Sequence, residues 1–200
     1  MKLSKLPVKP AKTGHFRIIN DQWRSRKLQF PAVDGLRPTP DRVRETLFNW
    51  LGHTIVSKNC LDLFSGCGAL GLEALSRGAA HCVFVDQSAS ALNAITQHLH
   101  TLEGKGTVQQ GRLPEAIAYL NGSFDTVFID PPYCLDNHAA CIEALVNKQL
   151  LANNAWIYCE NASDKPLPAL PANIQLHRHK KAGAVQYALF RYHQPLHHEA

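Results

Sequence analysis

The fold is decided by one stretch of the sequence, Cys60-Leu61-Asp62-Leu63-Phe64-Ser65-Gly66-Cys67-Gly68-Ala69-Leu70-Gly71-Leu72-Glu73. Its apolar start predicts a short buried strand, and its end predicts the beginning of a helix. Between them, Gly66, Gly68 and Gly71 have the G-x-G-x-x-G spacing of a nucleotide-binding loop. Glycine permits tight turns and a close approach of the backbone to a ligand. The spacing alone does not identify that ligand, because nucleotide binders of several chemistries share it.

Strand and helix patterns alternate along the rest of the chain. We predict strands at 81–85, 107–110, 124–129 and 155–160, helices at 40–51, 88–102, 114–120 and 138–151, and a closing β-hairpin at 174–179 and 185–192. This alternation predicts a mostly parallel α/β sheet, to which the closing hairpin adds one antiparallel strand at the edge. Ligands of such sheets bind at the carboxyl ends of the strands, where Asp62, Asp86 and Asp130 are expected to converge.

Positive charge is concentrated at the start of the chain. Residues 1–48 contain eleven Lys and Arg against four Asp and Glu, whereas the remainder contains ten against twelve. A basic segment attached to a nearly neutral domain favours a polyanionic partner, of which nucleic acid is the commonest. A solvated basic tail with no partner has the same composition, so the charge alone does not decide.

The basic segment divides into a tail and a hairpin. We predict a flexible tail at 1–15, a β-hairpin extension at 16–40, the main domain at 41–194 and a C-terminal tail at 195–200. In the hairpin, Trp23 either stacks on a base or packs on the main domain. The candidate phosphate contacts here and just beyond are Arg17, Arg24, Arg26, Lys27, Arg37 and Arg42. Thr39 is expected to cap the helix that starts at Pro40.

Several classes of protein are disfavoured by composition. The six cysteines form no C-x-x-C pair, and the histidines near the C-terminus have no Cys or carboxylate partner at metal spacing, so we expect buried free thiols and no metal. No apolar run approaches the ~20 residues of a membrane helix. The first ten residues lack the apolar core of a signal peptide. We expect a soluble, cytoplasmic protein.

Two aspartates narrow the choice of cofactor. Asp86 lies twenty residues after Gly66, where an acidic residue typically accepts the ribose hydroxyls of an adenine nucleoside. NAD and S-adenosylmethionine share that ribose, but NAD places a pyrophosphate at the glycine loop where S-adenosylmethionine places an ammonium and a sulfonium. Asp62, just before the loop, would repel the pyrophosphate and attract the ammonium and the sulfonium. Its alternative role is that of a turn-capping acid.

The sequence Asp130-Pro131-Pro132-Tyr133 points to a substrate amine. An amino group conjugated to a base ring is a poor nucleophile, because its lone pair is delocalised. The Asp130 carboxylate and the Pro131 carbonyl can accept its two N–H bonds and localise the lone pair toward a methyl group. The two prolines keep these acceptors aimed, and Tyr133 can stack on the base. Taken alone, the tetrapeptide could also be an ordinary Pro-Pro turn after a strand.

Residues 62–71 together with 130–133 resemble class I S-adenosylmethionine-dependent methyltransferases that act on exocyclic amines. The flanks are more specific and resemble the bacterial RsmD family over roughly residues 16–192. The matching segments include Gln22-Trp23-Arg24-Ser25-Arg26-Lys27-Leu28, Gly35-Leu36-Arg37-Pro38-Thr39, Asp41-Arg42-Val43-Arg44-Glu45-Thr46-Leu47 and Leu70-Gly71-Leu72-Glu73-Ala74-Leu75.

The resemblance implies a Rossmann-like, seven-stranded sheet with a small N-terminal hairpin that helps bind RNA. It implies methylation of the N2 amine of one guanine in 16S ribosomal RNA of the small subunit, by a protein that we expect to be a monomer. The implied catalytic residues are Asp130, Pro131, Pro132 and Tyr133. The implied cofactor-binding residues are Asp62, Phe64, Gly66, Gly68, Gly71, Asp86, Gln87, Arg112 and Leu113.

The sequence departs from the family pattern at two places, and three alternative functions remain to be distinguished. No carboxylate follows the third strand, at 110–113, to bind the adenine amine, and Asp21 and Ser25 stand near positions where glycines are expected. The alternatives are a DNA amino-methyltransferase, an NAD-type oxidoreductase and a non-catalytic RNA-binding assembly factor. The DNA enzyme would need a second target-recognition domain, which is not apparent in 200 residues. Asp62 and the Pro-Pro sequence argue against the oxidoreductase, and the intact Asp130 motif argues against the assembly factor.

Overall fold

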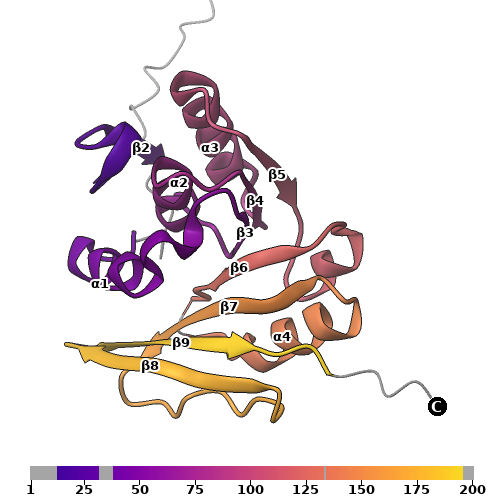
Figure 1. The fold of residues 1–200 in the computed structure, drawn as a ribbon. Helices are drawn as coiled ribbons and strands as arrows, with labels where there is room; N and C mark the ends of the chain where they lie inside the picture. The colour runs from indigo at the N-terminus through magenta and orange to yellow at the C-terminus, as the bar shows by residue number, and fades with distance from the viewer. Residues whose placement is uncertain (1–12, 32–37, 133, 196–200) are drawn as a thin grey trace, which may run out of the picture.

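The computed structural model describes residues 13–31, 38–132 and 134–195 (Figure 1). Its strands are β1 (Thr13–Arg17), β2 (Lys27–Pro31), β3 (Asn59–Leu63), β4 (His81–Asp86), β5 (Gly106–Gln110), β6 (Phe124–Ile129), β7 (Leu151–Ala162), β8 (Ile174–Ala182) and β9 (Val185–Tyr192). Its α-helices are α1 (Asp41–Leu51), α2 (Ala69–Ser76), α3 (Ala89–Leu102) and α4 (His138–Asn147). Short 3₁₀ helices are η1 (Asp21–Trp23), η2 (Gly52–Ile55) and η3 (Glu115–Tyr119).

Seven strands form the main sheet in the order β5-β4-β3-β6-β7-β9-β8. Neighbouring strands from β5 to β7 are parallel, whereas β9 is antiparallel to both β7 and β8. The predicted mostly parallel sheet with one antiparallel strand is therefore confirmed. The expected position of that strand was wrong, because β9 lies inside the sheet and β8 forms the edge. The closing hairpin inserts its second strand beside β7, so strand order differs from chain order.

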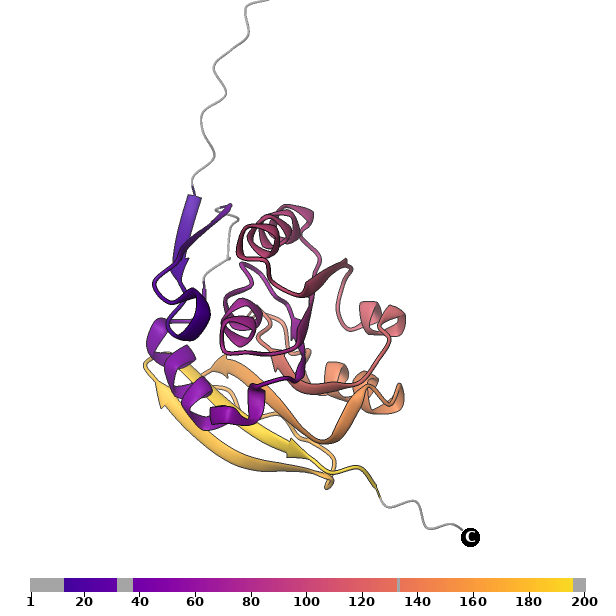
Figure 2. The same ribbon diagram turned by 45° about the horizontal axis from the view of Figure 1, so that its top comes forward.

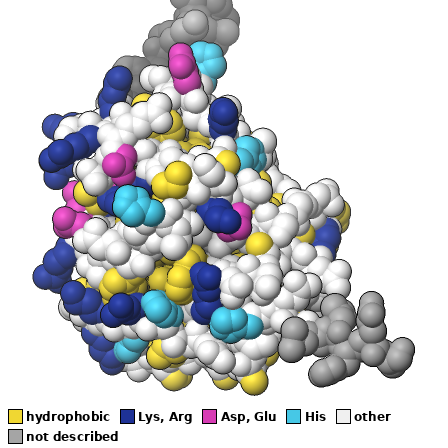
Figure 3. All heavy atoms as spheres, in the orientation of Figure 1, with side chains coloured by type: hydrophobic (Ala, Val, Ile, Leu, Met, Phe, Trp, Pro, Cys, Tyr) yellow, Lys and Arg dark blue, Asp and Glu magenta, His cyan; other side chains and the backbone are white. Residues whose placement is uncertain are grey.

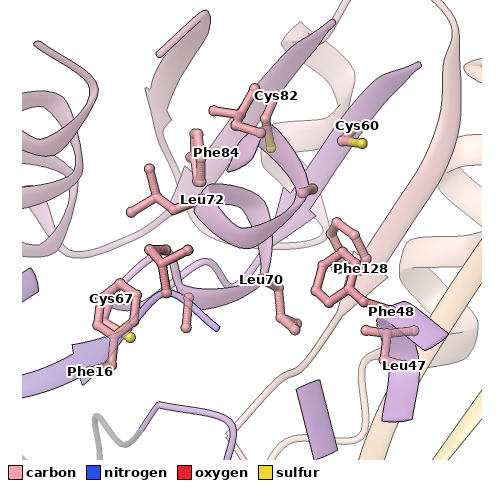
Figure 4. Close-up of a cluster of buried hydrophobic side chains, with 14 of the residues drawn as sticks. Phe16, Leu47, Phe48, Cys60, Cys67, Leu70, Leu72, Cys82, Phe84 and Phe128 are labelled. Carbon is pink, nitrogen blue, oxygen red and sulfur yellow. The ribbon is translucent and has the colours of Figure 1, made fainter. Parts of the chain in front are cut away.

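Helices cover both faces of the sheet (Figure 2). The buried residues of α1, α2 and α3 pack together with those of the N-terminal hairpin and of one face of the sheet. Figure 4 shows that α2 contributes Leu70 and Leu72 to this cluster, beside Phe84 and Phe128 from the sheet. On the other face, η3 and α4 pack on a second cluster that includes Leu63. The central strand β3 is buried from both sides, as its apolar sequence predicts.

The N-terminal hairpin is present, and it begins earlier than predicted. β1 pairs antiparallel with β2 from Thr13 onward, so residues 13–15 belong to the strand and not to the tail. Asp21 and Ser25 have φ angles of 62° and 66°, in the left-handed region that favours glycine. These are the residues where glycines were expected, and the chain keeps the glycine-like backbone without the glycines.

Trp23 packs on the main domain. Its side chain is buried, and its backbone N–H donates to Ser76 Oγ at the end of α2 (3.0 Å). A Cβ at Gly104 would lie 2.9 Å from the Trp23 ring, so the indole closes directly over that glycine beyond α3. The interpretation of Trp23 as a stacking platform for a base is therefore wrong, because the ring is already covered.

Element boundaries differ from the predictions mainly in the C-terminal third. α4 ends at Asn147, four residues before the predicted end, and β7 is longer than predicted at both ends. Gly52 ends α1 as predicted, with φ 52°. Within residues 13–31, 38–132 and 134–195, none of the helices is long and apolar enough to cross a membrane.

Candidate active site

Three aspartates come together at the carboxyl ends of neighbouring parallel strands. Asp62 lies in β3 and Asp86 ends β4, while Asp130 directly follows β6, whose Ile129 pairs with Leu63 of β3. Asp62 is buried, which raises the pKa of its carboxyl well above the ordinary value, and the nearby charges of Asp130 and Asp86 raise it further. The predicted convergence of these residues is confirmed.

Asp62 is oriented by the helix that follows the glycine loop. The Gly71 N–H donates to Asp62 Oδ2 (2.9 Å), and this bond lowers the pKa of the carboxyl against the larger effect of burial. A Cβ on Gly71 would lie 2.3 Å from Cε1 of Phe84 and 2.8 Å from Sγ of Cys82, both in β4. Gly71 therefore serves the close packing of α2 on the sheet and the placement of Asp62, while its contact with a cofactor stays a prediction.

The glycine loop is shaped by left-handed residues and by Asp86. Gly66, Gly68 and Phe64 have φ angles of 52°, 77° and 58°. The Gly66 N–H donates to Asp86 Oδ2 and the Ser88 N–H to Asp86 Oδ1, each at 2.8 Å. Each carboxylate oxygen keeps a second lone pair for a ligand. Asp86 thus fixes the loop and can still accept hydroxyl hydrogens.

The segment after β5 lies against Asp86, as the Gly111 N–H donates to the Asp86 carbonyl (3.0 Å). Arg112 is exposed, whereas the Leu113 side chain is buried and its carbonyl accepts from Asn137 Nδ2 (3.1 Å). The exposed Gln87 receives a hydrogen bond on its carbonyl from Gln110 Nε2 (3.2 Å). Sequence reasoning missed Asn137 and Gln110, since neither stands in a recognisable motif.

Asp130 has a partner that the sequence did not reveal. Thr39 Oγ1 donates to Asp130 Oδ2 (3.1 Å), across 91 residues of chain. Thr39 was expected to cap α1, but the N-cap residue is Pro40 and no side chain caps the helix. Burial raises the pKa of Asp130 to about 6, against the lowering effect of the Thr39 hydrogen bond. Pro131 is buried and Pro132 is exposed, and Tyr133 lies outside the described residues.

Arg44 is fully buried and holds Thr39 in place. Its Nε donates to the Thr39 carbonyl (3.2 Å), and its Nη2 donates to the Arg17 carbonyl (2.8 Å) and to Asp41 Oδ1 (2.6 Å). Its Nη1 lies 3.4 Å from Oε2 of Glu73, another fully buried charge. Sequence reasoning overlooked Arg44, although its spacing to Leu47, Phe48 and Leu51 places it on the buried stripe of α1.

Glu73 joins the hairpin to α2. Its carboxylate accepts from the backbone N–H groups of Ile19 (2.8 Å) and Asn20 (3.2 Å) and from Arg77 Nε (2.9 Å). Together, Thr39, Arg44 and Glu73 form a buried polar cluster that connects the hairpin, α1 and α2 to Asp130. Paired and hydrogen-bonded burial of this kind is how charges are tolerated in a protein interior.

The candidate RNA-binding cations have separate environments. Arg24, Arg26 and Lys27 of the hairpin and Arg42 of α1 are exposed. Arg17 is also exposed and lies 3.4 Å from Asp41 in an ion pair. Arg37 lies outside the described residues. Apart from Trp23, the described candidates are therefore accessible to a polyanion.

The donor set fits a cationic adenosine cofactor. Within the described ranges, no Lys or Arg forms an ion pair with Asp62, Asp86 or Asp130. Carboxylates without a counter-ion attract an ammonium and a sulfonium and repel a pyrophosphate. The described residues contain no group of three or more His, Cys, Asp and Glu that could hold a metal ion. The residues present thus fit S-adenosylmethionine better than NAD.

Comparison with known proteins gives one family and several similar chains. The family model described as Conserved hypothetical protein 95 matches residues 16–191. Ribosomal RNA small subunit methyltransferase D of Escherichia coli is 44% identical over 180 residues, which are 90% of this chain and 91% of that protein. The protein of the same name from Haemophilus influenzae is 39% identical over 187 residues, 91% of this chain and 96% of that one.

A solved structure has the same fold. The structure described as a putative methyltransferase, yhhF, from Escherichia coli superposes with a TM-score of 0.80 and 43% sequence identity. The match covers 91% of this chain and 100% of that one. The likeness therefore extends over most of this chain and all of that one.

Proposed function

Because the chain belongs to the Conserved hypothetical protein 95 family, the RsmD family that its sequence resembles, we propose that it methylates the N2 amine of a guanine in 16S ribosomal RNA. The chain is a methyltransferase that uses S-adenosylmethionine, and its substrate is ribosomal RNA. The choice of guanine N2 goes further and rests on the resemblance to the RsmD family, and the choice of the small subunit rests on the names of the relatives.

The observation that carries the proposal is the placement of Asp130. Its carboxylate is fixed by Thr39 at the end of β6, at the same edge of the sheet as Asp62 and Asp86. An aromatic amine in this position donates one N–H to Asp130 and the other to the Pro131 carbonyl. Both bonds strengthen as the nitrogen becomes positive during attack, so they stabilise the transition state more than the ground state.

The chain supplies the acceptors and the alignment. When bound, S-adenosylmethionine supplies an electrophilic methyl group on a sulfonium. Asp62 and the loop from Phe64 to Gly68 bind its cationic methionine end, and Asp86 accepts the ribose hydroxyls. The segment around Arg112 and Leu113 borders the adenine. Holding nucleophile and methyl group in line removes much of the entropic cost of a two-molecule reaction.

Asp130 accepts an N–H best when it is ionised. With a pKa of about 6, the carboxyl is mostly ionised at neutral pH and becomes protonated in mild acid. We therefore expect the rate of transfer to rise with pH through this range and to level off above it.

The hairpin supports a ribosomal RNA substrate. Arg24, Arg26 and Lys27 are exposed on the N-terminal hairpin, where phosphate contacts would fix the position of the RNA without reading its sequence. We propose that the protein acts as a monomer. We place the enzyme in the cytoplasm, where a bacterial small subunit is assembled.

The test combines substrate choice with product analysis. Enzyme and methyl-labelled S-adenosylmethionine are incubated with small subunits from cells lacking the enzyme, with protein-free 16S RNA, with large subunits and with DNA, and the nucleosides are then separated. We expect label in N2-methylguanosine from small subunits. N6-methyladenine in DNA would indicate the DNA amino-methyltransferase, and binding to small subunits without any label would indicate the assembly factor.

A further inference from the structure

The β8 edge of the sheet carries a second group of cations, separate from the cations of the N-terminal hairpin. β8 is the edge strand, and its residues from Gln175 to Lys181 are all exposed. Five of these seven are basic or histidine, and none is acidic: His177, Arg178, His179, Lys180 and Lys181. Charged side chains on an edge strand also prevent unwanted strand pairing, so their presence alone does not indicate a ligand. Their position in the sheet decides the question.

The pairing register brings this group level with the catalytic residue. Asp130 follows Ile129, whose partners across β7, β9 and β8 are Cys159, Ala188 and His179. Because β8 runs parallel to β6, the next residue along β8, Lys180, is level with Asp130. Three strand spacings of ~4.8 Å place their Cα atoms roughly 14 Å apart. Lys180 thus stands at the catalytic edge of the sheet.

Two of these cations lie on the same face of the sheet as α1. Arg178 pairs with Leu189 and Lys180 with Tyr187, and directly paired residues share a face. Tyr187 in turn packs on Trp50 of α1, with 5.3 Å between ring centroids. This is the face on which the N-terminal hairpin packs. Arg178 and Lys180 therefore lie on the face of the sheet that also carries the N-terminal hairpin with its own cations.

The surface view agrees with this arrangement. Figure 3 shows Lys and Arg side chains gathered in two groups along the left margin of the molecule, one over the β1–β2 hairpin and one over the β8–β9 hairpin. The surface over α1 separates them. Figure 1 shows the β8–β9 hairpin reaching to the same side of the molecule as the N-terminal hairpin.

We propose that Arg178 and Lys180 bind backbone phosphates of the RNA substrate, so that the RNA is held at the β8–β9 hairpin beside the catalytic edge as well as at the N-terminal hairpin. This inference rests on the proposed function and extends it to a second contact surface. Phosphate contacts at the N-terminal hairpin only would leave the RNA free to pivot about that hairpin. Contacts at both hairpins fix its orientation, which delivery of a single amine to Asp130 requires.

The test compares two charge-matched double variants. Arg178→Gln with Lys180→Gln removes the proposed contacts. Lys105→Gln with Lys148→Gln removes two exposed cations that precede β5 and β7, at the opposite end of the strands. Affinity for unmodified small subunits and for protein-free 16S RNA is measured over a series of KCl concentrations at constant Mg²⁺, together with kcat and KM.

Loss of two phosphate contacts should lower the slope of log affinity against log salt by about 1.4–1.8. We expect KM to rise roughly tenfold near physiological salt, with kcat unchanged and with the control like the unaltered protein. A slope and KM equal to those of the control would overturn the inference. So would weaker binding to subunits with unchanged binding to protein-free RNA, which would indicate a ribosomal protein as the partner. Methylation of a different nucleoside, with the slope lowered as expected, would refute only the proposed function.

Discussion

The hydroxyl of Thr39 donates a hydrogen bond to the carboxylate of Asp130, with 3.1 Å between Oγ1 and Oδ2. Thr39 stands just before α1, on the part of the chain that links the hairpin to the main domain, and Asp130 stands at the end of β6. One hydrogen bond therefore connects the start of the domain to the residue expected to receive the substrate amine.

Replacement of Thr39 by Val should shift the pH dependence of the reaction. The hydrogen bond lowers the pKa of Asp130, which is about 6 when the bond is present, so its loss raises that pKa. The acidic limb of the kcat profile should move to higher pH by roughly one unit, the equivalent of one charge-assisted hydrogen bond. Thr39→Ser keeps the hydroxyl and should keep the original profile. An unshifted profile for Thr39→Val would mean that the bond does not act on catalysis.

Replacement of Asp130 by Asn should separate binding from transfer. The amide keeps the shape of the side chain but loses the charge that favours N–H donation. We expect kcat to fall about 100-fold or more, the range seen when one charge-stabilising contact is removed from an active site. S-adenosylmethionine affinity, measured by calorimetry, should change by less than about twofold. A collapse of cofactor affinity with normal turnover of bound enzyme would assign Asp130 to the cofactor instead.

Replacement of Arg44 by Met should destabilise the fold. The substitution keeps much of the side-chain volume but leaves Glu73 with one cation fewer in the interior and removes the donor to the Thr39 carbonyl. Removal of one member of a buried ion pair typically costs about 3–5 kcal/mol of unfolding free energy. Urea denaturation measures this, with the exposed Arg42→Met on the same helix as the control, expected within about 0.5 kcal/mol of the unaltered protein. Adding Glu73→Gln to Arg44→Met should recover part of the loss.

Replacement of Asp62 by Asn should stabilise the protein while it weakens cofactor binding. Burial raises the pKa of Asp62 above its unfolded value, so between those two pKa values the folded state holds a proton that the unfolded state has released. Stability is therefore lost as pH rises through this range. The neutral Asn avoids that loss, so the variant should gain thermal stability at pH 8 and little or nothing near pH 4. Equal gains at both pH values would mean that the Asp62 charge is not the cause.

The sequence was sufficient for the parts of the fold that depend on local pattern. The apolar strands end where the aspartates begin, because a buried strand must give way to polar residues at the edge of the sheet. Asp62, Asp86 and Asp130 could therefore be placed together before the structure was known. The glycine loop could also be predicted from local sequence, because the left-handed φ angles at 66 and 68 are ones that glycine adopts readily.

What the sequence did not reveal depends on partners that are distant in the chain. Thr39 has the local features of a helix cap, and only the tertiary fold offers it Asp130 instead. Trp23 is as consistent with stacking on a base as with packing, until α3 and Gly104 are placed beside it. The insertion of β9 between β7 and β8 has no signal in the strand sequences, since chain order alone does not give strand order.

The cluster around Glu73 has a consequence for how the substrate must adapt. Ile19 and Asn20 are anchored to Glu73 through their backbone N–H groups, and Trp23 is anchored to Ser76. The turn of the hairpin is thus anchored to α2 and cannot move toward the RNA without breaking these hydrogen bonds. We therefore expect the hairpin to keep its position on binding, so that the RNA must change conformation to expose the target amine. Access of the target amine to Asp130 should then depend on how easily its nucleotide unstacks. The folding state of the RNA would thus control the rate of methylation.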